Sequence, residues 1–124
     1  MEIGMKLVEL SSKNNGVEAV DTLYGDEIVS VEAEAMPGGQ QVTTGKAAIR
    51  AKNVWWVENQ EIHKLEVTGP WPHGDRFIVH YKIDCTCKAG PMAGKRMNME
   101  EAALYTVKDG KIVKEEFFYP RHAM

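Results

Sequence analysis

The sequence predicts an α+β fold in which three helices pack on one face of a curved antiparallel sheet. Apolar residues recur at helical spacing over much of the chain up to residue 59, whereas apolar and polar residues alternate from residue 61 onward. Segments rich in Gly, Pro and Asn separate these runs. Helices that precede a block of antiparallel strands are typical of α+β domains.

Three helices are expected from the spacing of apolar residues. The spacing predicts the first helix over residues 2–13, the second over residues 17–24 and the third over about residues 46–59. On the third helix, Ile49 and Trp56 lie on one stripe. We therefore expect this stripe to face the rest of the domain.

Strands are expected where apolar and polar residues alternate between turn segments. They cover residues 28–34, 61–68, 76–88, 97–107 and 111–119. The last four strands follow one another through turns, which predicts antiparallel pairing. The turn Lys108-Asp109-Gly110 closes the final hairpin.

Length and composition limit the kind of protein this chain forms. Its 124 residues are expected to form one domain, residues 1–124, with a core and room for one pocket. The 15 Lys and Arg and the 18 Asp and Glu are scattered, so we expect no binding to nucleic acid. No run approaches the ~20 apolar residues of a membrane helix, and the start of the chain does not resemble a signal peptide. A cytoplasmic protein without membrane association is therefore expected.

The two cysteines indicate a reducing compartment rather than a disulfide or a metal site. Cys85 and Cys87 lie two apart in a predicted strand, where their Cβ atoms are too distant for an easy disulfide. We expect free thiols. No second Cys or His pair has zinc spacing, so neither a metal ion nor another cofactor is expected.

The strand over residues 97–107 is the most informative segment, because it places a carboxylate on an apolar face. Successive strand side chains point to opposite faces, so Glu101 shares its face with Met99, Ala103 and Tyr105. A carboxylate on such a face is unfavourable unless it is paired, protonated or functional. We expect Glu101 either to act as a neutral acid that donates a hydrogen bond to a substrate, or to be held by a cation.

Candidate cations for Glu101 are Arg50, His63 and Lys114. His63 is expected to point inward, because alternation places it on the face of the apolar residues of its strand. A neutral imidazole beside a carboxyl group can exchange a proton with it. The alternatives are a core histidine with satisfied hydrogen bonds, and a buried ion pair that only stabilises the interior.

The return strand carries a second acid whose orientation depends on the preceding turn. One of its faces holds Glu115, Phe117 and Tyr119, and the opposite face holds Glu116 and Phe118. A turn of two residues and a turn of three, the latter with Gly110 in the left-handed conformation, bring different faces inward. We favour the three-residue turn, which places Glu115 opposite Ala103.

Three segments carry a family resemblance, in order and at similar spacing. They are Leu23-Tyr24-Gly25-Asp26-Glu27, Gly45-Lys46-Ala47-Ala48-Ile49-Arg50 and Tyr105-Thr106-Val107-Lys108-Asp109-Gly110. They resemble, respectively, the approach to the first strand, the start of the third helix and the final hairpin of nuclear transport factor 2-like proteins. Within this superfamily the chain is most similar to the SnoaL-like branch. The resemblance implies a cystatin-like, cone-shaped barrel in which three N-terminal helices pack on the concave face of the sheet, with a pocket between helices and sheet. It also implies a homodimer, often formed through the outer face of the sheet.

The superfamily includes ketosteroid isomerases and polyketide cyclases, which use one carboxylate as a base and a second acid or a tyrosine as the oxyanion donor. The resemblance implies that Glu32 occupies the position of the base. The other two isomerase positions fall on Ala103 and Val8, which argues against steroid isomerase activity as such. Glu101 lies one position along the same face from Ala103.

Together, these observations suggest three kinds of function. The leading hypothesis is a cofactor-free acid/base enzyme, of isomerase, cyclase or hydrolase type, that acts on a small hydrophobic carbonyl compound. Its candidate catalytic residues are Glu32, Glu101 and His63, and its candidate substrate contacts are Tyr105, Trp56, Met99, Glu115, Phe117 and Tyr119. The alternatives are a non-catalytic module that binds a small molecule, and a structural homodimer whose pocket is filled by its own side chains.

Overall fold

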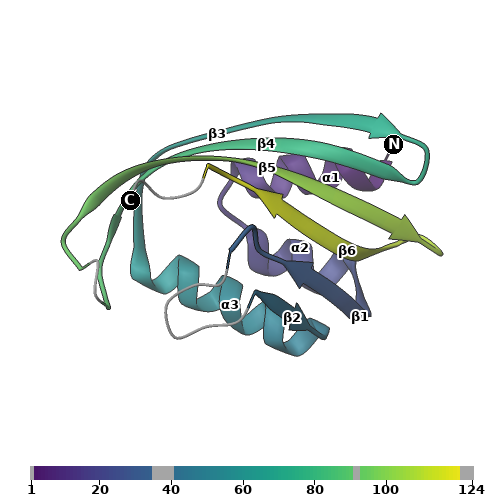
Figure 1. The fold of residues 1–124 in the computed structure, drawn as a ribbon, viewed down its shortest axis with the longest axis horizontal. Coiled ribbons are helices and arrows are strands. Elements are labelled where there is room, and N and C mark those ends of the chain that lie inside the picture. The colour runs from purple at the N-terminus through teal and green to yellow at the C-terminus, as the bar shows by residue number, and fades with distance from the viewer. Residues whose placement is uncertain (1, 35–40, 91–92, 121–124) are drawn as a thin grey trace.

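The computed structural model describes residues 2–34, 41–90 and 93–120 (Figure 1). Its elements in chain order are α1 (Glu2–Ser12), α2 (Gly16–Leu23), β1 (Tyr24–Val31), β2 (Val42–Thr44), α3 (Lys46–Asn59), β3 (Gln60–His73), β4 (Arg76–Cys87), β5 (Arg96–Lys108) and β6 (Lys111–Phe118). Helices thus precede a block of long strands, and the predicted α+β class is confirmed.

All of the strands belong to one curved sheet with the order β2-β1-β6-β5-β4-β3 (Figure 1). Strands β3 to β6 pair antiparallel with their neighbours, as predicted, whereas β1 lies parallel to β6. The sheet does not close into a barrel, because β2 and β3 form two separate edges. This arrangement brings the first strand of the chain beside the last.

The helices lie on the concave side of the sheet, as predicted (Figure 1). Leu7 of α1, Val20 of α2 and Ile49 of α3 are buried against sheet residues such as Phe77 and Tyr105. Burial of these apolar surfaces supplies the main driving force for this packing. Among the described residues, no helix is long and apolar enough to cross a membrane.

Most predicted boundaries agree closely with the structure, but β3 runs on to His73, five residues beyond its predicted end at residue 68, and the start of the sheet also differs. Helix α3 covers the predicted residues, and β4 and β6 each end one residue earlier than predicted. Strand β1 begins at Tyr24, which the apolar spacing had assigned to the second helix. Strand β2 was not predicted, because three residues are too few to show a period.

A β-bulge in β3 reverses the expected orientation of His63. The register with β4 shifts between Ile62 and Lys64, so His63 is an extra residue in its strand. Ile62, not His63, therefore lies opposite the buried Cys85. The His63 side chain is exposed, and its Nε2 lies 2.7 Å from the Thr86 hydroxyl oxygen. The prediction of an inward His63 is wrong, because strict alternation does not hold across a bulge.

The β5–β6 hairpin turns Glu115 to the concave side, but by a different route from the one expected. Its turn has two residues, Asp109 and Gly110, with φ angles of 52° and 76°, so the prediction of a three-residue turn is wrong. A bulge then inserts one extra residue into β6. As a result Glu115 pairs with Tyr105 rather than with Ala103. The extra residue of the bulge thus turns the Glu115 side chain inward, which is the orientation that the three-residue turn was expected to give.

The outer face of the sheet exposes several large apolar side chains. Trp71 of β3, Ile78 of β4 and Phe118 of β6 are 53%, 40% and 53% exposed. Trp71 and Ile78 are partners in the strand register. The homodimer expected from the family resemblance concerns this face and stays a prediction.

Candidate functional site

Three carboxyl groups gather on the concave side of the sheet. Glu101 of β5 lies opposite the buried Tyr81 of β4, as its position on the apolar face predicted. Glu115 of β6 is only 4% exposed. Glu32 follows the end of β1, and its side chain is 18% exposed. The negative charge of Glu32 affects the pKa of both other acids, so the three groups interact.

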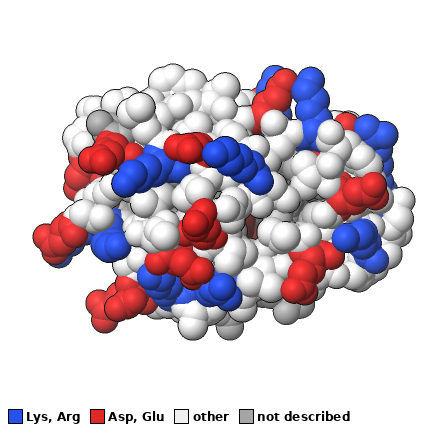
Figure 2. Space-filling model, turned by 180° about the vertical axis from the view of Figure 1, so that it is seen from behind, with Lys and Arg blue, Asp and Glu red and all other residues white. Residues whose placement is uncertain are grey.

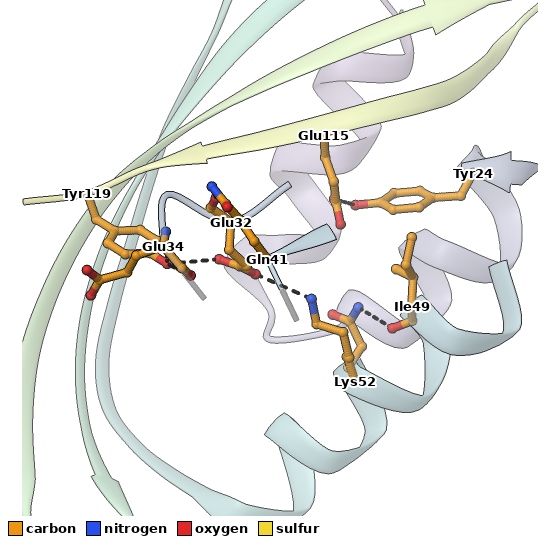
Figure 3. A network of polar contacts seen from close by, with 9 residues as sticks. Tyr24, Glu32, Glu34, Gln41, Ile49, Lys52, Glu115 and Tyr119 are labelled. Atoms are coloured by element: carbon orange, nitrogen blue, oxygen red, sulfur yellow. Dashed lines mark hydrogen bonds and ion pairs between the residues drawn. The ribbon is translucent and has the colours of Figure 1, made fainter. Parts of the chain in front are cut away.

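The innermost of these acids, Glu115, is hydrogen-bonded to Tyr24, the first residue of β1. The Tyr24 hydroxyl donates to Oε2 of Glu115 (Figure 3). Burial raises the pKa of Glu115, and this effect is partly opposed by Tyr24, by the neighbouring Ser30 hydroxyl and by Lys52. Burial and the charge of Glu115 raise the pKa of Tyr24 well above its usual value. Tyr24 therefore remains a hydrogen-bond donor at any physiological pH.

Two further tyrosines continue this polar layer into the core. The hydroxyl oxygens of Tyr81 and Tyr105 lie 2.7 Å apart. The Tyr105 ring stacks on Phe77, with ring centres 5.1 Å apart. Burial raises the pKa of Tyr81 to about 12 and the pKa of Tyr105 well above its usual value. Tyr105, a predicted substrate contact, thus has its hydroxyl engaged within the protein.

Glu101 differs from the other two acids, because no described side chain forms a hydrogen bond or ion pair with it. It is half-buried. Burial raises its pKa to about 7, and the negative charges of Glu32 and Glu115 add to the effect. Near neutral pH this group therefore exists both as an acid and as a carboxylate. A carboxyl group in this state can donate or accept a proton.

None of the three cations predicted as partners of this carboxyl group pairs with it. Arg50 instead pairs with Asp21 at 2.8 Å, and Lys114 with Glu116 at 3.7 Å. His63 is on the outer face. The expectation of an ion pair with one of these three residues is therefore wrong, and the alternative of a neutral acid fits the described surroundings.

Glu32 is held at both of its carboxylate oxygens (Figure 3). The Lys52 Nζ of α3 lies 3.3 Å from Oε1, and the hydroxyl of Tyr119, just beyond β6, donates to Oε2 at 3.3 Å. The Glu32 backbone N–H also donates to the Gln41 carbonyl at 2.8 Å. These contacts fix the carboxylate between the end of β1, helix α3 and the end of β6.

Sequence reasoning missed both Lys52 and Tyr24. The one signal for Lys52 was its position three residues after the core residue Ile49, which puts both on one side of α3. Tyr24 is buried in the core. Its bond to Glu115 joins residues 91 positions apart, which local sequence patterns do not reveal.

The remaining predicted substrate contacts differ in their surroundings. Trp56, Met99 and Phe117 are all half-buried. Phe117 packs against the core. Met99 borders a depression that is lined mainly by charged side chains of β3, β4 and β5. None of the three acids Glu32, Glu101 and Glu115 lines this depression. Their roles in binding stay predictions.

The described residues offer no cluster of three or more His, Cys, Asp or Glu side chains that could hold a metal ion. Cys85 and Cys87 are free and buried. On the face shown in Figure 2, acidic and basic side chains are interspersed, with no large patch of one sign.

Comparison with known proteins agrees with this fold. A family model described as a SnoaL-like domain matches residues 1–119. A candidate SnoaL-like polyketide cyclase from Mesorhizobium loti, also labelled a carbohydrate phosphatase, is 42% identical to the chain. The match has a TM-score of 0.85 and covers 95% of this chain and 97% of that one. No curated protein matches the sequence.

More distant structures share the fold. A candidate isomerase from Bacillus subtilis is 15% identical, with a TM-score of 0.73, and the match covers 94% of this chain and 82% of that one. A protein of ketosteroid isomerase-like fold from Catenulispora acidiphila, solved with trimethylamine, is 17% identical, with a TM-score of 0.67 and coverage of 91% and 81%. At these identities the likeness concerns the fold alone.

The raised pKa of Glu101 predicts a pH-dependent stability. The folded state holds this proton up to about pH 7, whereas the carboxyl of an unfolded chain releases it near 4.5. Folding therefore takes up a proton between these values, and the free energy of unfolding falls as the pH rises through them. We expect a fall of roughly 1–3 kcal/mol, allowing for solvent screening, measured by chemical denaturation at a series of pH values.

The variant Glu101→Gln should lack this fall and should be more stable than the wild type above about pH 8. Glu100→Gln is the matched control, because it makes the same change at the exposed neighbouring residue. A Glu101→Gln protein with the wild-type pH profile would show that this carboxyl titrates normally.

The Tyr24–Glu115 hydrogen bond predicts strong coupling between two substitutions. Tyr24→Phe and Glu115→Met should each cost about 1–3 kcal/mol, because each leaves a buried polar group without its partner. The double variant should lose clearly less than the sum, since neither polar group then remains. Thermal or chemical denaturation of the four proteins measures this. Strictly additive losses would contradict the coupling.

Proposed function

Because the chain belongs to the SnoaL-like family, we propose that it is an acid/base enzyme that acts on a small hydrophobic carbonyl compound without a bound cofactor. The observation that carries the proposal is that two acids on the concave side have different surroundings. Glu101 has a pKa of about 7, whereas Glu32 has the ammonium group of Lys52 beside it. Two carboxyl groups whose surroundings differ in this way can serve as acid and base in one reaction.

Glu32 is the proposed base. Its carboxylate would take a proton from the carbon next to the carbonyl group, and the electron pair of that C–H bond would pass into an enolate. Glu101, in its protonated form, would donate a hydrogen bond to the oxygen on which negative charge develops. The absence of a described hydrogen-bond partner leaves its carboxyl free for this contact.

The enolate has two productive outcomes. Where a C=C bond extends the enolate into a dienolate, return of the proton from Glu32 to the far carbon shifts the double bond and gives an isomer of the substrate. Attack of the enolate carbon on a second carbonyl group forms a C–C bond and closes a ring, and a proton then passes to the new alkoxide. Both outcomes need the same first step, so that step is the one to test.

Exchange of hydrogen for deuterium tests carbon-acid chemistry without knowledge of the natural substrate. Small ketones such as cyclohexanone, 2-tetralone and acetylacetone are incubated with the protein in D2O, and loss of the α-proton signal is followed by NMR. The wild type should accelerate exchange for at least one ketone. Glu32→Gln and Glu101→Gln should each lower that rate by about 10²-fold or more.

Matched controls come from exposed acids on β1, which precedes Glu32, and on β5, which contains Glu101. Glu27→Gln on β1 and Glu100→Gln on β5 should exchange at the wild-type rate, as should His63→Ala on the outer face. Full activity in Glu32→Gln and Glu101→Gln would rule out this mechanism. Ketone binding without any exchange would favour a non-catalytic binding module, and the absence of both would favour a domain whose pocket is filled by its own side chains.

A further inference from the structure

The parallel pairing of β1 with β6 ends before it reaches Glu32. Its last register pair is Val31 with Glu116, and the two segments continue to Glu34 and Tyr119 without further backbone pairing among the described residues. The Tyr119 side chain crosses this gap instead. Its hydroxyl oxygen lies 3.3 Å from Oε2 of Glu32, 3.4 Å from the backbone carbonyl oxygen of Glu34 and 3.5 Å from the Glu34 backbone nitrogen (Figure 3).

The Tyr119 hydroxyl has one proton and two acceptors within reach. A carboxylate accepts a stronger hydrogen bond than a neutral carbonyl, because that bond is charge-assisted. The proton is therefore directed mainly at Glu32, while the Glu34 N–H donates to the tyrosine oxygen and orients the hydroxyl. Through this one tyrosine, the Glu32 carboxylate is tied to the backbone of Glu34.

The other described contacts hold Glu32 differently. Two hydrogen bonds to Gln41, of 2.8 Å and 3.1 Å, fix its backbone N–H and carbonyl but not its carboxylate. The Lys52 ammonium group contacts Oε1 at 3.3 Å, but its side chain is 43% exposed and has a long, flexible stem. Tyr119 is half-buried, and its ring turns about only two side-chain bonds. Tyr119 is therefore the described partner best suited to fix the orientation of the carboxylate.

We propose that Tyr119 is a positioning residue whose hydroxyl holds the Glu32 carboxylate in one orientation, rather than a contact to the substrate as the sequence suggested. The inference rests on the proposed function and deepens it. A base takes a proton efficiently only when its oxygen is held close to the C–H bond that breaks. An orientation fixed in this way affects the rate of the chemical step more than it affects binding.

Tyr119→Phe removes the hydroxyl and keeps the ring, so it tests this role. With a ketone that the wild type exchanges, the deuterium-exchange rate at saturating ketone should fall roughly tenfold, and the half-saturating concentration should change less than about twofold. A contact to the substrate would give the opposite pattern, with a raised half-saturating concentration and an unchanged rate at saturation. That pattern would overturn the inference.

A second measurement needs no substrate. NMR relaxation of the Glu32 side-chain methylene groups, whose signals are assigned by their loss in Glu32→Gln, gives their order parameter. It should fall by roughly 0.2 in Tyr119→Phe, because the carboxylate then loses one of its two described side-chain partners. Phe118→Leu is the matched control, because it changes the neighbouring aromatic ring, which is 53% exposed on the outer face. It should leave both the exchange rate and the order parameter unchanged.

An unchanged order parameter in Tyr119→Phe, or an equal fall in Phe118→Leu, would overturn the inference even where ketone exchange proceeds. A wild type that exchanges no ketone would instead contradict the proposed function, while the order parameter would still decide whether Tyr119 holds Glu32. The two failures are therefore distinguishable.

Discussion

The hydrogen bond from Tyr24 to Glu115 joins the first strand of the sheet to the last, at a point where the helices exclude water. A carboxyl group in such a place must be protonated or hydrogen-bonded, because an isolated buried charge is strongly unfavourable. Tyr24 meets this requirement for Glu115. The bond thereby fixes an acid deep on the concave side, and the negative charge of Glu115 contributes to the raised pKa of Glu101.

The three acids acquire different properties from their different surroundings. Glu115 is enclosed and bonded to a tyrosine, Glu32 is bonded to an ammonium group and a hydroxyl, and Glu101 is half-buried with no described partner. Each negative charge makes the next harder to form, so Glu101, which has no partner among the described residues, retains its proton up to about pH 7. A fold with one helix-covered sheet face can thus hold an acid and a base side by side.

The sequence predicted much of this arrangement, because strand alternation is a reliable guide where the register is unbroken. Glu101 was correctly placed on the concave side by counting along β5, which pairs with β4 without a shift. The same counting failed at His63, where a bulge inserts a residue. The prediction that Glu115 points inward is correct only because a bulge in β6 adds one residue, in place of the third turn residue that was expected. Tyr24 and Lys52 were missed as partners, since their contacts depend on tertiary packing.

The central claim is that Glu101 keeps its proton to near-neutral pH within the folded domain, and its carboxyl carbon reports this directly. An NMR titration of the wild-type protein, with the Glu101 signal assigned by its loss in Glu101→Gln, measures the midpoint. We expect a midpoint of about 7. A midpoint near 4.5, the ordinary value for a glutamate, would mean that this carboxyl is solvated and ionised, and it would contradict the account.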